Sequence, residues 1–336
     1  MNQSKHPMVI VVGASAGGMQ ATAQLTAQFP KDFPAAIFIV NHMGADNNGD
    51  VLTRVLNESG GLPCTQAHDE QPFQSGHIYL APPDHHILLV KGKILVTKGA
   101  RENRYRPAID PLFRSAAVAY GNRVIGIILT GYLDDGTSGM MAIKRCGGVC
   151  IVQDPLDASY PDMPQSVIAN VGADYCLPIA AMGMLLSDLV RRKLPSSSPP
   201  PKDIVIEAEI AQRVLSDLPA VEALGAQVPF NCPDCGGVLW QIEGDFLRYR
   251  CHTGHAFTST VLLAQQTAKI EETLWVALRM FEERQNLIAT MGQSQGKSSS
   301  SVSQRVQDSQ VHIDRIRAML KATHQDVDNS DQGETE

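Results

Sequence analysis

The sequence predicts an α/β fold: a doubly wound, mostly parallel sheet with helices on both faces, followed by a small zinc-ribbon-like and helical C-terminal domain. Three observations predict this class. Unbroken apolar runs, typical of strands buried on both faces, occur at 8–12, 35–40, 123–130 and 149–153. Helical patterns separate these runs, which favours parallel strands joined by crossover helices. Beyond residue 203, cysteines at metal-ligand spacing replace the long apolar runs.

Charge and composition exclude several classes of partner. The 336 residues carry 28 basic and 35 acidic side chains, a net charge of −7, and the basic ones are scattered. We therefore expect no nucleic-acid surface and no polybasic membrane patch. No run approaches the ~18 apolar residues of a membrane helix, and no targeting pattern opens the chain, so we expect a cytoplasmic protein without membrane insertion. Four of the seven cysteines are expected to be buried, small apolar residues of a reducing compartment: Cys64, Cys146, Cys150 and Cys176.

The first strand runs into Gly13-Ala-Ser15-Ala-Gly17, a match to the G-x-S-x-G elbow that holds a nucleophilic serine above a sheet. A helix at 19–29 follows, and backbone N–H groups at its start would face a developing oxyanion. A dinucleotide loop is one alternative, but it needs G-x-G-x-x-G, and Ser15 replaces the middle glycine. An ordinary tight turn is the other.

The next elements place histidines and a hairpin. The second strand, 35–40, ends at His42, and a helix is expected at 50–56. After a strand at 76–80, the pattern predicts a hairpin with strands 87–90 and 94–97. His85 and His86 lie directly before the first strand of this hairpin. Because neighbouring residues of a strand point to opposite faces, we do not expect these two histidines to share a metal ion.

The following segment predicts helices that alternate with two further strands. Asp110 and Pro111 are typical of the N-cap and first turn of a helix, here at 112–120. Arg104 and Arg106 precede it in a loop, where they could meet an acidic partner, although solvated arginines are the commoner case. The strand at 123–130 delivers Asp134 and Asp135 ahead of a helix at 138–146, and the strand at 149–153 is followed by a helix at 165–171.

Three kinds of side chain follow three of the predicted strands: Ser15, His42, and Asp134 or Asp135. The carboxyl ends of parallel strands meet at one edge of a sheet, where ligands bind. A serine, a histidine and an aspartate that converge there are the groups needed for acyl transfer. His42 would take the proton of Ser15, and an aspartate would orient the imidazole.

These residues lie in blocks by which residues 8 to about 190 resemble the catalytic domain of the chemotaxis protein-glutamate methylesterases. The blocks occur in the family's order over about 180 residues, which is more specific than any single motif. They are Gly13-Ala-Ser-Ala-Gly-Gly18, Asn41-His-Met43, Ala81-Pro-Pro-Asp-His-His86, Arg106-Pro-Ala-Ile-Asp-Pro-Leu-Phe113, Leu129-Thr-Gly-Tyr-Leu-Asp-Asp-Gly136, and Gln153-Asp154 with Met163-Pro164.

The resemblance implies that Ser15 is the nucleophile, His42 the base and Asp135 the orienting acid, because the family's aspartate directly precedes a glycine. It places Ala16, Gly131 and Tyr132 at the oxyanion and substrate positions. It further implies hydrolysis of γ-glutamyl methyl esters on a methylated chemoreceptor-like protein, with release of methanol. Some members also deamidate glutamine, and no catalytic cofactor is implied.

The chain departs from typical members in three places. Only seven residues precede the first strand, where typical members carry a receiver domain, so we expect a different mode of regulation. Tyr132 replaces a methionine beside the oxyanion region, and Gln165 replaces an arginine, which favours an altered specificity. The alternative function is a catalytically weak esterase fold that serves as a zinc-containing interaction module in a signalling complex.

A Pro/Ser-rich stretch divides the chain. The expected parts are a methylesterase-like catalytic domain, a linker, a zinc-ribbon-like domain with a long helix, and a flexible tail with a short amphipathic helix. A helix is predicted around 207–218, and a partner helix or a second copy is expected on the C-terminal helices. The catalytic domain is expected at 1–192, the linker at 193–203, the zinc-ribbon-like domain at 204–292 and the flexible tail at 293–336.

The spacing Cys232-x2-Cys235-x15-Cys251-x3-His255 predicts a structural zinc held by four protein ligands, with paired strands at 238–240 and 247–249 between the two pairs. His252 is the rival of His255 as a ligand. A redox C-x-x-C is the alternative, but it lacks a βαβ setting. We expect this domain to fold on its own and to supply no catalytic group, so that removal of zinc leaves the esterase active.

Apolar residues at helical spacing predict a long helix at 258–288 and a second, shorter one at 306–320. The segments 292–303 and 326–336 are polar, and we expect both to be unstructured.

Overall fold

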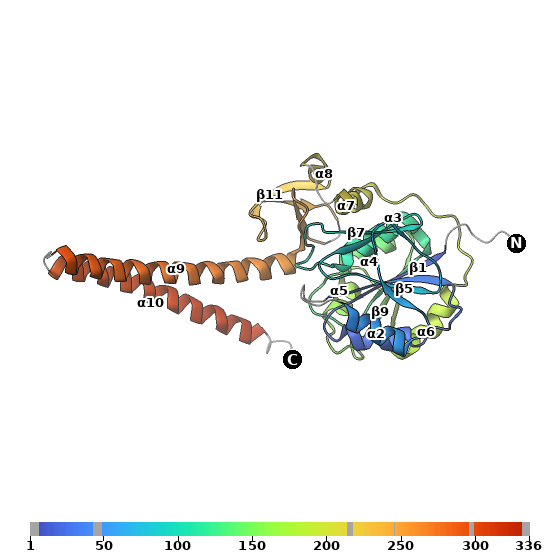
Figure 1. Cartoon of the computed structure of the whole chain (residues 1–336). Coiled ribbons are helices and arrows are strands. Elements are labelled where there is room, and N and C mark those ends of the chain that lie inside the picture. The colour runs from blue at the N-terminus through green and yellow to red at the C-terminus, as the bar shows by residue number, and fades with distance from the viewer. Residues whose placement is uncertain (1–6, 43–48, 214–217, 245, 296–298, 331–336) are drawn as a thin grey trace. The chain divides into compact units, whose positions relative to one another are not determined.

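The computed structural model describes residues 7–42, 49–213, 218–244, 246–295 and 299–330. The chain forms two compact units, Met1–Leu262 and Leu263–Glu336, which are described separately (Figure 1). The division falls near the start of the long helix α9 and not at the Pro/Ser-rich stretch. The first unit therefore contains the predicted ribbon as well as the parallel sheet.

The first unit is built on a seven-stranded sheet of order β10-β9-β8-β1-β2-β5-β3, in which every neighbouring pair is parallel. This confirms the predicted fold class. The central strand β1 has each of its residues buried, as expected for a strand covered on both faces. The strands are β1 (Met8–Ala14), β2 (Ala35–Asn41), β3 (Cys64–Gln66), β5 (His77–Leu80), β8 (Val124–Ile128), β9 (Val149–Gln153) and β10 (Tyr175–Leu177).

Helices cover both faces of this sheet (Figure 1). Alternate residues of β1 enter opposite cores, Ile10 and Val12 one of them and Val9 and Val11 the other. One core is closed by α1 (Gly18–Thr26), α2 (Asp50–Ser59) and α6 (Ile179–Leu189). The other is closed by α3 (Ile109–Tyr120), α4 (Thr137–Arg145), α5 (Asp162–Asn170) and a small antiparallel sheet of β4 (Gln71–Pro72), β7 (Lys93–Thr97) and β6 (His86–Val90).

Helices α3 and α5 begin earlier than the sequence pattern predicts. Helix α3 begins at Ile109 with Ala108 as its N-cap, so the prediction of Asp110 as N-cap is wrong. The Asp110 carboxylate lies in the first turn and accepts the N–H of Gly139 of α4 at 2.6 Å. Helix α5 begins at Asp162, because Pro164 is tolerated in a first turn, where its missing N–H has no partner to lose.

The ribbon is a four-stranded antiparallel sheet of order β11-β12-β13-β14. The two strands predicted between the cysteine pairs are present, as β12 (Val238–Ile242) and β13 (Arg248–Cys251). The sheet is completed by β11 (Gly225–Asn231) and β14 (Ala256–Thr258), and it is preceded by α7 (Lys202–Arg213) and α8 (Leu218–Glu222). The end of the predicted helix 207–218 lies partly outside the described residues.

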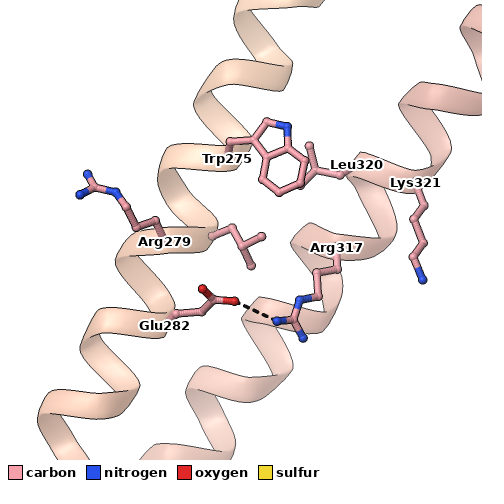
Figure 2. A pocket seen from close by; sticks show the side chains of 7 residues that line it. Trp275, Arg279, Glu282, Arg317, Leu320 and Lys321 are labelled. Carbon is pink, nitrogen blue, oxygen red and sulfur yellow. Dashed lines mark hydrogen bonds and ion pairs between the residues drawn. The ribbon is translucent and has the colours of Figure 1, made fainter.

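The second unit consists of the helix pair α9 (Ser259–Gln295) and α10 (Ser299–Ser330) from Leu263 onward. Its core is formed by Leu278, Ile313, Ile316 and Leu320. A groove of about 470 Å³ lies between the two helices, where Arg317 donates to the Glu282 carboxylate at 2.8 Å (Figure 2). Apolar side chains such as Ile270 and Trp275 remain exposed, and the expected partner helix or second copy stays a prediction.

Both C-terminal helices are longer than predicted. The segment expected to be unstructured at 292–303 is helical up to residue 295 and from residue 299, and α10 continues to Ser330. The expectation of a short helix in a flexible tail is therefore wrong. Packing of the two helices against each other stabilises polar turns that would be marginal in isolation. Residues 331–336 of the predicted acidic tail lie outside the described residues.

Three of the four cysteines expected in the interior are buried, and one is exposed. Cys64, Cys146 and Cys150 are buried, but Cys176 is exposed, because it lies on β10 at the edge of the sheet. Burial raises the pKa of the Cys64 and Cys150 thiols to about 12, so both stay protonated.

Among the helices in the described part of the chain, none has the length and apolar character to cross a bilayer. The expected cytoplasmic location stays a prediction.

Candidate active site

Ser15 lies in the turn between β1 and α1. Its N–H donates to the carbonyl of Thr130 at 3.0 Å, which ties the turn to the end of β8. Gly17 adopts the left-handed backbone that the turn requires, with φ of 73°. A Cβ on Gly131 would lie 2.7 Å from the Cβ of Ser15, so glycine at 131 leaves the room that the serine needs.

His42 follows β2 and bridges the serine to a carboxylate. Its Nδ1 lies 3.0 Å from Ser15 Oγ, and its Nε2 lies 2.8 Å from Asp135 Oδ2. The imidazole is 4% exposed, and the ring of Tyr105 stacks on it at 3.5 Å between centroids. Because a carboxylate can only accept, Nε2 carries the proton, which leaves the Nδ1 lone pair to accept the serine hydroxyl.

Asp135 is held as an ion inside the protein. Burial alone raises the pKa of Asp135, but hydrogen bonds from His42, from the Ile109 N–H and from Asn103 lower it below its ordinary value. The Ile109 N–H donates to Oδ2 at 2.7 Å, and the Asn103 amide donates to Oδ1 at 3.0 Å. The buried carboxylate is therefore ready to stabilise an imidazolium on His42 when the histidine takes a proton.

Asp134 differs from Asp135 in its hydrogen bonds and in the direction in which its pKa is shifted. The hydrogen-bonded chain runs from Ser15 through His42 to Asp135. Asp134 is 8% exposed, and within the described residues its Oδ1 has no hydrogen-bond partner. Burial raises the pKa of Asp134 to about 6.

We expect Asp134→Asn to stabilise the protein at neutral and alkaline pH. Folding raises the pKa of the Asp134 carboxyl from 3.8 to about 6. Below pH 4 the carboxyl is neutral in the folded protein, and the free energy of unfolding falls as the pH rises from there through 6. The change should raise the free energy of unfolding at pH 8 by about 3 kcal/mol more than at pH 4. Urea unfolding of both proteins at the two pH values measures this, and an equal difference at both would contradict the buried charge.

The three residues expected at the oxyanion and substrate positions have different surroundings. Ala16 follows Ser15 in the turn that opens α1. The N–H of Gly131 donates to the carbonyl of Tyr160 at 2.9 Å, so Gly131 lies beside the serine with its donor already committed. Tyr132 is 49% exposed, and its ring packs against that of Tyr160 with 4.4 Å between centroids.

Sequence reasoning missed Asn103, Tyr105 and the N–H of Ile109. Asn103 and Arg104 both have positive φ, 48° and 74°, in a conformation that asparagine tolerates better than most residues. Asn103-Arg-Tyr105 directly precedes the block at 106–113, and this proximity was the available signal.

Other polar side chains of the region are structural. Arg106 meets an acidic partner, the alternative to a solvated arginine, because its Nη2 pairs with Asp84 at 2.6 Å and its Nη1 donates to the Gly99 carbonyl. His86 is buried between the carbonyl of Ala100 and the N–H of Ala108, and His85 Nδ1 bonds to the carbonyl of Pro83.

The four predicted metal ligands converge in the ribbon. The sulfur atoms of Cys232, Cys235 and Cys251 and a ring nitrogen of His255 all lie within 4.8 Å of one another. Two tight turns hold them: the Gly236 N–H donates to the carbonyl of Cys232, and the Gly254 N–H to that of Cys251. His252, the rival ligand, lies against Gly237. Three thiols and an imidazole are a donor set that fits zinc.

A serine, a histidine and an aspartate in one hydrogen-bonded chain, at the strand ends of a parallel α/β sheet, define a site of the serine-hydrolase class. Residues 10–186 of the 336 match the CheB methylesterase family. This is more than half of the chain, and the protein belongs to that family.

Curated relatives agree with this assignment. A Leptospira interrogans protein, provisionally named a protein-glutamate methylesterase/protein-glutamine glutaminase, is 38% identical over 186 residues, 55% of this chain and 96% of its own length. Proteins named protein-glutamate methylesterase/protein-glutamine glutaminase from Trichodesmium erythraeum and Thermotoga maritima are 37% and 34% identical to this chain. The alignments cover 55% and 54% of this chain, and 52% and 54% of the two relatives. The chain thus spans about half the length of these two relatives.

A solved structure shows the same fold. The crystal structure of the Thermotoga maritima CheB methylesterase catalytic domain is 33% identical and has a TM-score of 0.53, covering 55% of this chain and 99% of the other. The matched portion leaves the ribbon and the C-terminal helices without a counterpart in that structure.

Proposed function

We propose that the protein is a protein-glutamate methylesterase that hydrolyses glutamyl γ-methyl esters on a chemoreceptor-like protein and releases methanol. The chain of hydrogen bonds from Ser15 through His42 to Asp135, in a member of the CheB methylesterase family, carries this proposal. The intact geometry favours it over a catalytically weak esterase fold.

The mechanism follows from the proton positions. His42 Nδ1 takes the Ser15 proton as Oγ attacks the ester carbonyl, and Asp135 stabilises the imidazolium. The Ala16 N–H at the start of α1 faces the developing oxyanion, where the positive end of the helix also helps. His42 then returns the proton to the leaving methoxide, and water hydrolyses the acyl-enzyme by the reverse steps. Glutamine deamidation uses the same acyl-enzyme, with ammonia as the leaving group.

A receptor fragment tests the substrate class. A purified chemoreceptor cytoplasmic fragment that carries glutamyl methyl esters should lose the mass of one CH₂ per hydrolysed ester when it is incubated with the protein. Fragments that carry glutamine at the same positions should show the mass change of amide to acid if the protein also deamidates. Unchanged masses of both fragments would contradict a receptor substrate.

We propose further that Cys232, Cys235, Cys251 and His255 hold one structural zinc, with no metal in the chemistry. Four protein ligands leave no open position for substrate or water. Binding of zinc to such small sites contributes about 10–16 kcal/mol, largely as folding free energy.

Replacing both Cys232 and Cys235 by serine should abolish zinc uptake and lower the melting temperature of the protein. Elemental analysis and thermal unfolding measure the two effects. Replacement of the exposed Cys176 by serine is the matched control and should change neither. One equivalent of zinc retained by the double variant would exclude these cysteines as ligands.

A further inference from the structure

We propose that Asn103 is a positioning residue through which the C-terminal ribbon holds the Asp135 carboxylate, so that the ribbon is part of the working active site. The inference rests on the proposed esterase function. It revises the expectation that the ribbon acts independently of the chemistry.

The side chain of Asn103 contacts both the ribbon and the Asp135 carboxylate. It is 2% exposed. Its Nδ2 donates to Asp135 Oδ1 at 3.0 Å and to Asp110 Oδ2 at 2.9 Å, and its Oδ1 accepts the N–H of Thr258 at 3.2 Å. Thr258 is the last residue of the ribbon strand β14. The amide of Asn103 therefore spans from the ribbon to the catalytic carboxylate with hydrogen bonds at both ends.

The contact with Thr258 fixes which end of the amide faces the carboxylates. A backbone N–H can only donate, so the oxygen of Asn103 must point to Thr258 and its NH₂ group to Asp110 and Asp135. With the ribbon absent, the amide oxygen loses this donor, and only the contacts of the NH₂ group with Asp110 and Asp135 hold the side chain. Ribbon docking thus reinforces the amide orientation that supports the Asp135 anion.

The same turn holds His42 from the other side. The N–H of Asn103 donates to the carbonyl of Ala256 at 2.8 Å, and Glu102 forms a parallel bridge with Ala256. Glu102 and Tyr105 exchange backbone hydrogen bonds across the turn, and Tyr105 stacks on His42. One ribbon strand therefore orders the turn that contacts both the imidazole and the aspartate.

Buried ion pairs attach the ribbon at this place. Glu102 accepts from Arg114 of α3 and from Arg250 of β13, at 2.6 Å and 3.1 Å. Glu207 of α7 pairs with Arg248 and Arg250, at 2.9 Å and 3.3 Å. Four of these five side chains are at most 4% exposed, and breaking one buried partner leaves an uncompensated charge. Removal of one of these side chains should therefore destabilise the docked arrangement.

Apolar packing makes a second connection next to Asp135. Leu133 packs against the ribbon core that contains Cys232 and Cys251. Two of the proposed metal ligands thus belong to the same cluster as a residue two positions before the catalytic aspartate. Loss of order at the metal site should reach Asp135 through Leu133 as well as through Asn103.

The loss of a donor to Asp135 has a measurable sign. Among the described residues, the titratable groups that act on this carboxylate include His42, Asp110, Asp134 and His86, with the Tyr105 hydroxyl further along the site. Asn103 stabilises the anion, so its removal should raise the pKa of the Asp135 carboxyl. The acid limb of the rate profile should then move to higher pH.

Asn103→Ala in the full chain tests the positioning role. Hydrolysis of a nitrophenyl ester should lose about 10- to 100-fold in kcat, the range seen when a partner that orients a functional group is removed. KM should hardly change, and the acid limb should move upward. Asn122→Ala, which removes an exposed amide bonded to the Pro195 carbonyl, is the matched control and should change none of these. A fall in kcat without a shift of the limb would overturn the role.

A double-variant comparison tests the part of the ribbon. Cys232→Ser with Cys235→Ser should shift the acid limb in the same direction, and addition of Asn103→Ala should cost less in kcat there than in the intact protein. Fully additive losses would overturn the coupling.

Hydrogen–deuterium exchange separates this proposal from the esterase function. The segment 256–262 should exchange faster in Asn103→Ala than in the Asn122→Ala control, because the Thr258 N–H loses its acceptor. Unchanged exchange would overturn the proposal even in an active esterase. Absence of Ser15-dependent hydrolysis in the unmodified protein would instead overturn the proposed function.

Discussion

Replacing Ser15 by alanine should lower hydrolysis of a nitrophenyl ester by about 10⁶-fold in kcat, the loss seen when a serine protease loses its nucleophile. In the proposed mechanism the Ser15 hydroxyl is the group that attacks, and His42 Nδ1 lies 3.0 Å from it to take its proton. KM should change little, because the substitution removes only the Ser15 hydroxyl and leaves in place the groups that bind the rest of the substrate. Steady-state rates of the two proteins measure this effect.

Ser59→Ala is the matched control for this prediction. Its hydroxyl donates to the carbonyl of Val55 on the exposed side of α2, and its loss should leave the rate unchanged. A Ser15→Ala protein that retains a tenth of the activity would exclude Ser15 as the nucleophile.

Replacing Asp135 by asparagine should lower kcat by about 10⁴-fold, as the corresponding change does in the serine-protease template. An amide has only one accepting oxygen. It cannot take the Nε2–H of His42, the N–H of Ile109 and the Asn103 amide together. The imidazole then loses its tautomer and its orientation towards Ser15. Rates at the pH optimum and thermal unfolding of the same samples separate this loss from misfolding.

Asp134→Asn is the neighbouring control and should change kcat by less than about threefold, because the hydrogen-bonded chain bypasses Asp134. The reverse pattern, a large loss for Asp134→Asn and a small one for Asp135→Asn, would transfer the orienting role to Asp134.

The sheet and its three polar strand ends could be predicted from the sequence because their causes are local. An apolar run predicts a buried strand, and the residue after it lies at the sheet edge where Ser15, His42 and Asp135 meet. The cysteine spacing likewise predicts the convergence of the four proposed metal ligands. Asp110 misled the prediction because a good N-cap residue also serves as a buried acceptor for another helix.

The support of the site could not be predicted in this way. Asn103 meets Thr258 across 155 positions of the chain, and Arg250 meets Glu102 across 148. No spacing rule connects such residues, since only the packed ribbon brings them together. Helix α10 exceeds its prediction for a related reason, because its polar turns gain stability from α9 and not from their own pattern.

Trapping of the acyl-enzyme is the most direct test of the central claim, that Ser15 transfers a glutamyl acyl group. The protein is mixed with a blocked glutamate γ-methyl ester, quenched in acid within milliseconds and digested. The account predicts that the peptide containing Ser15 gains the mass of the substrate minus methanol, and that Ser15→Ala gives no adduct. Methanol release by Ser15→Ala at the rate of the unmodified protein, with no adduct on the Ser15 peptide of either, would contradict it.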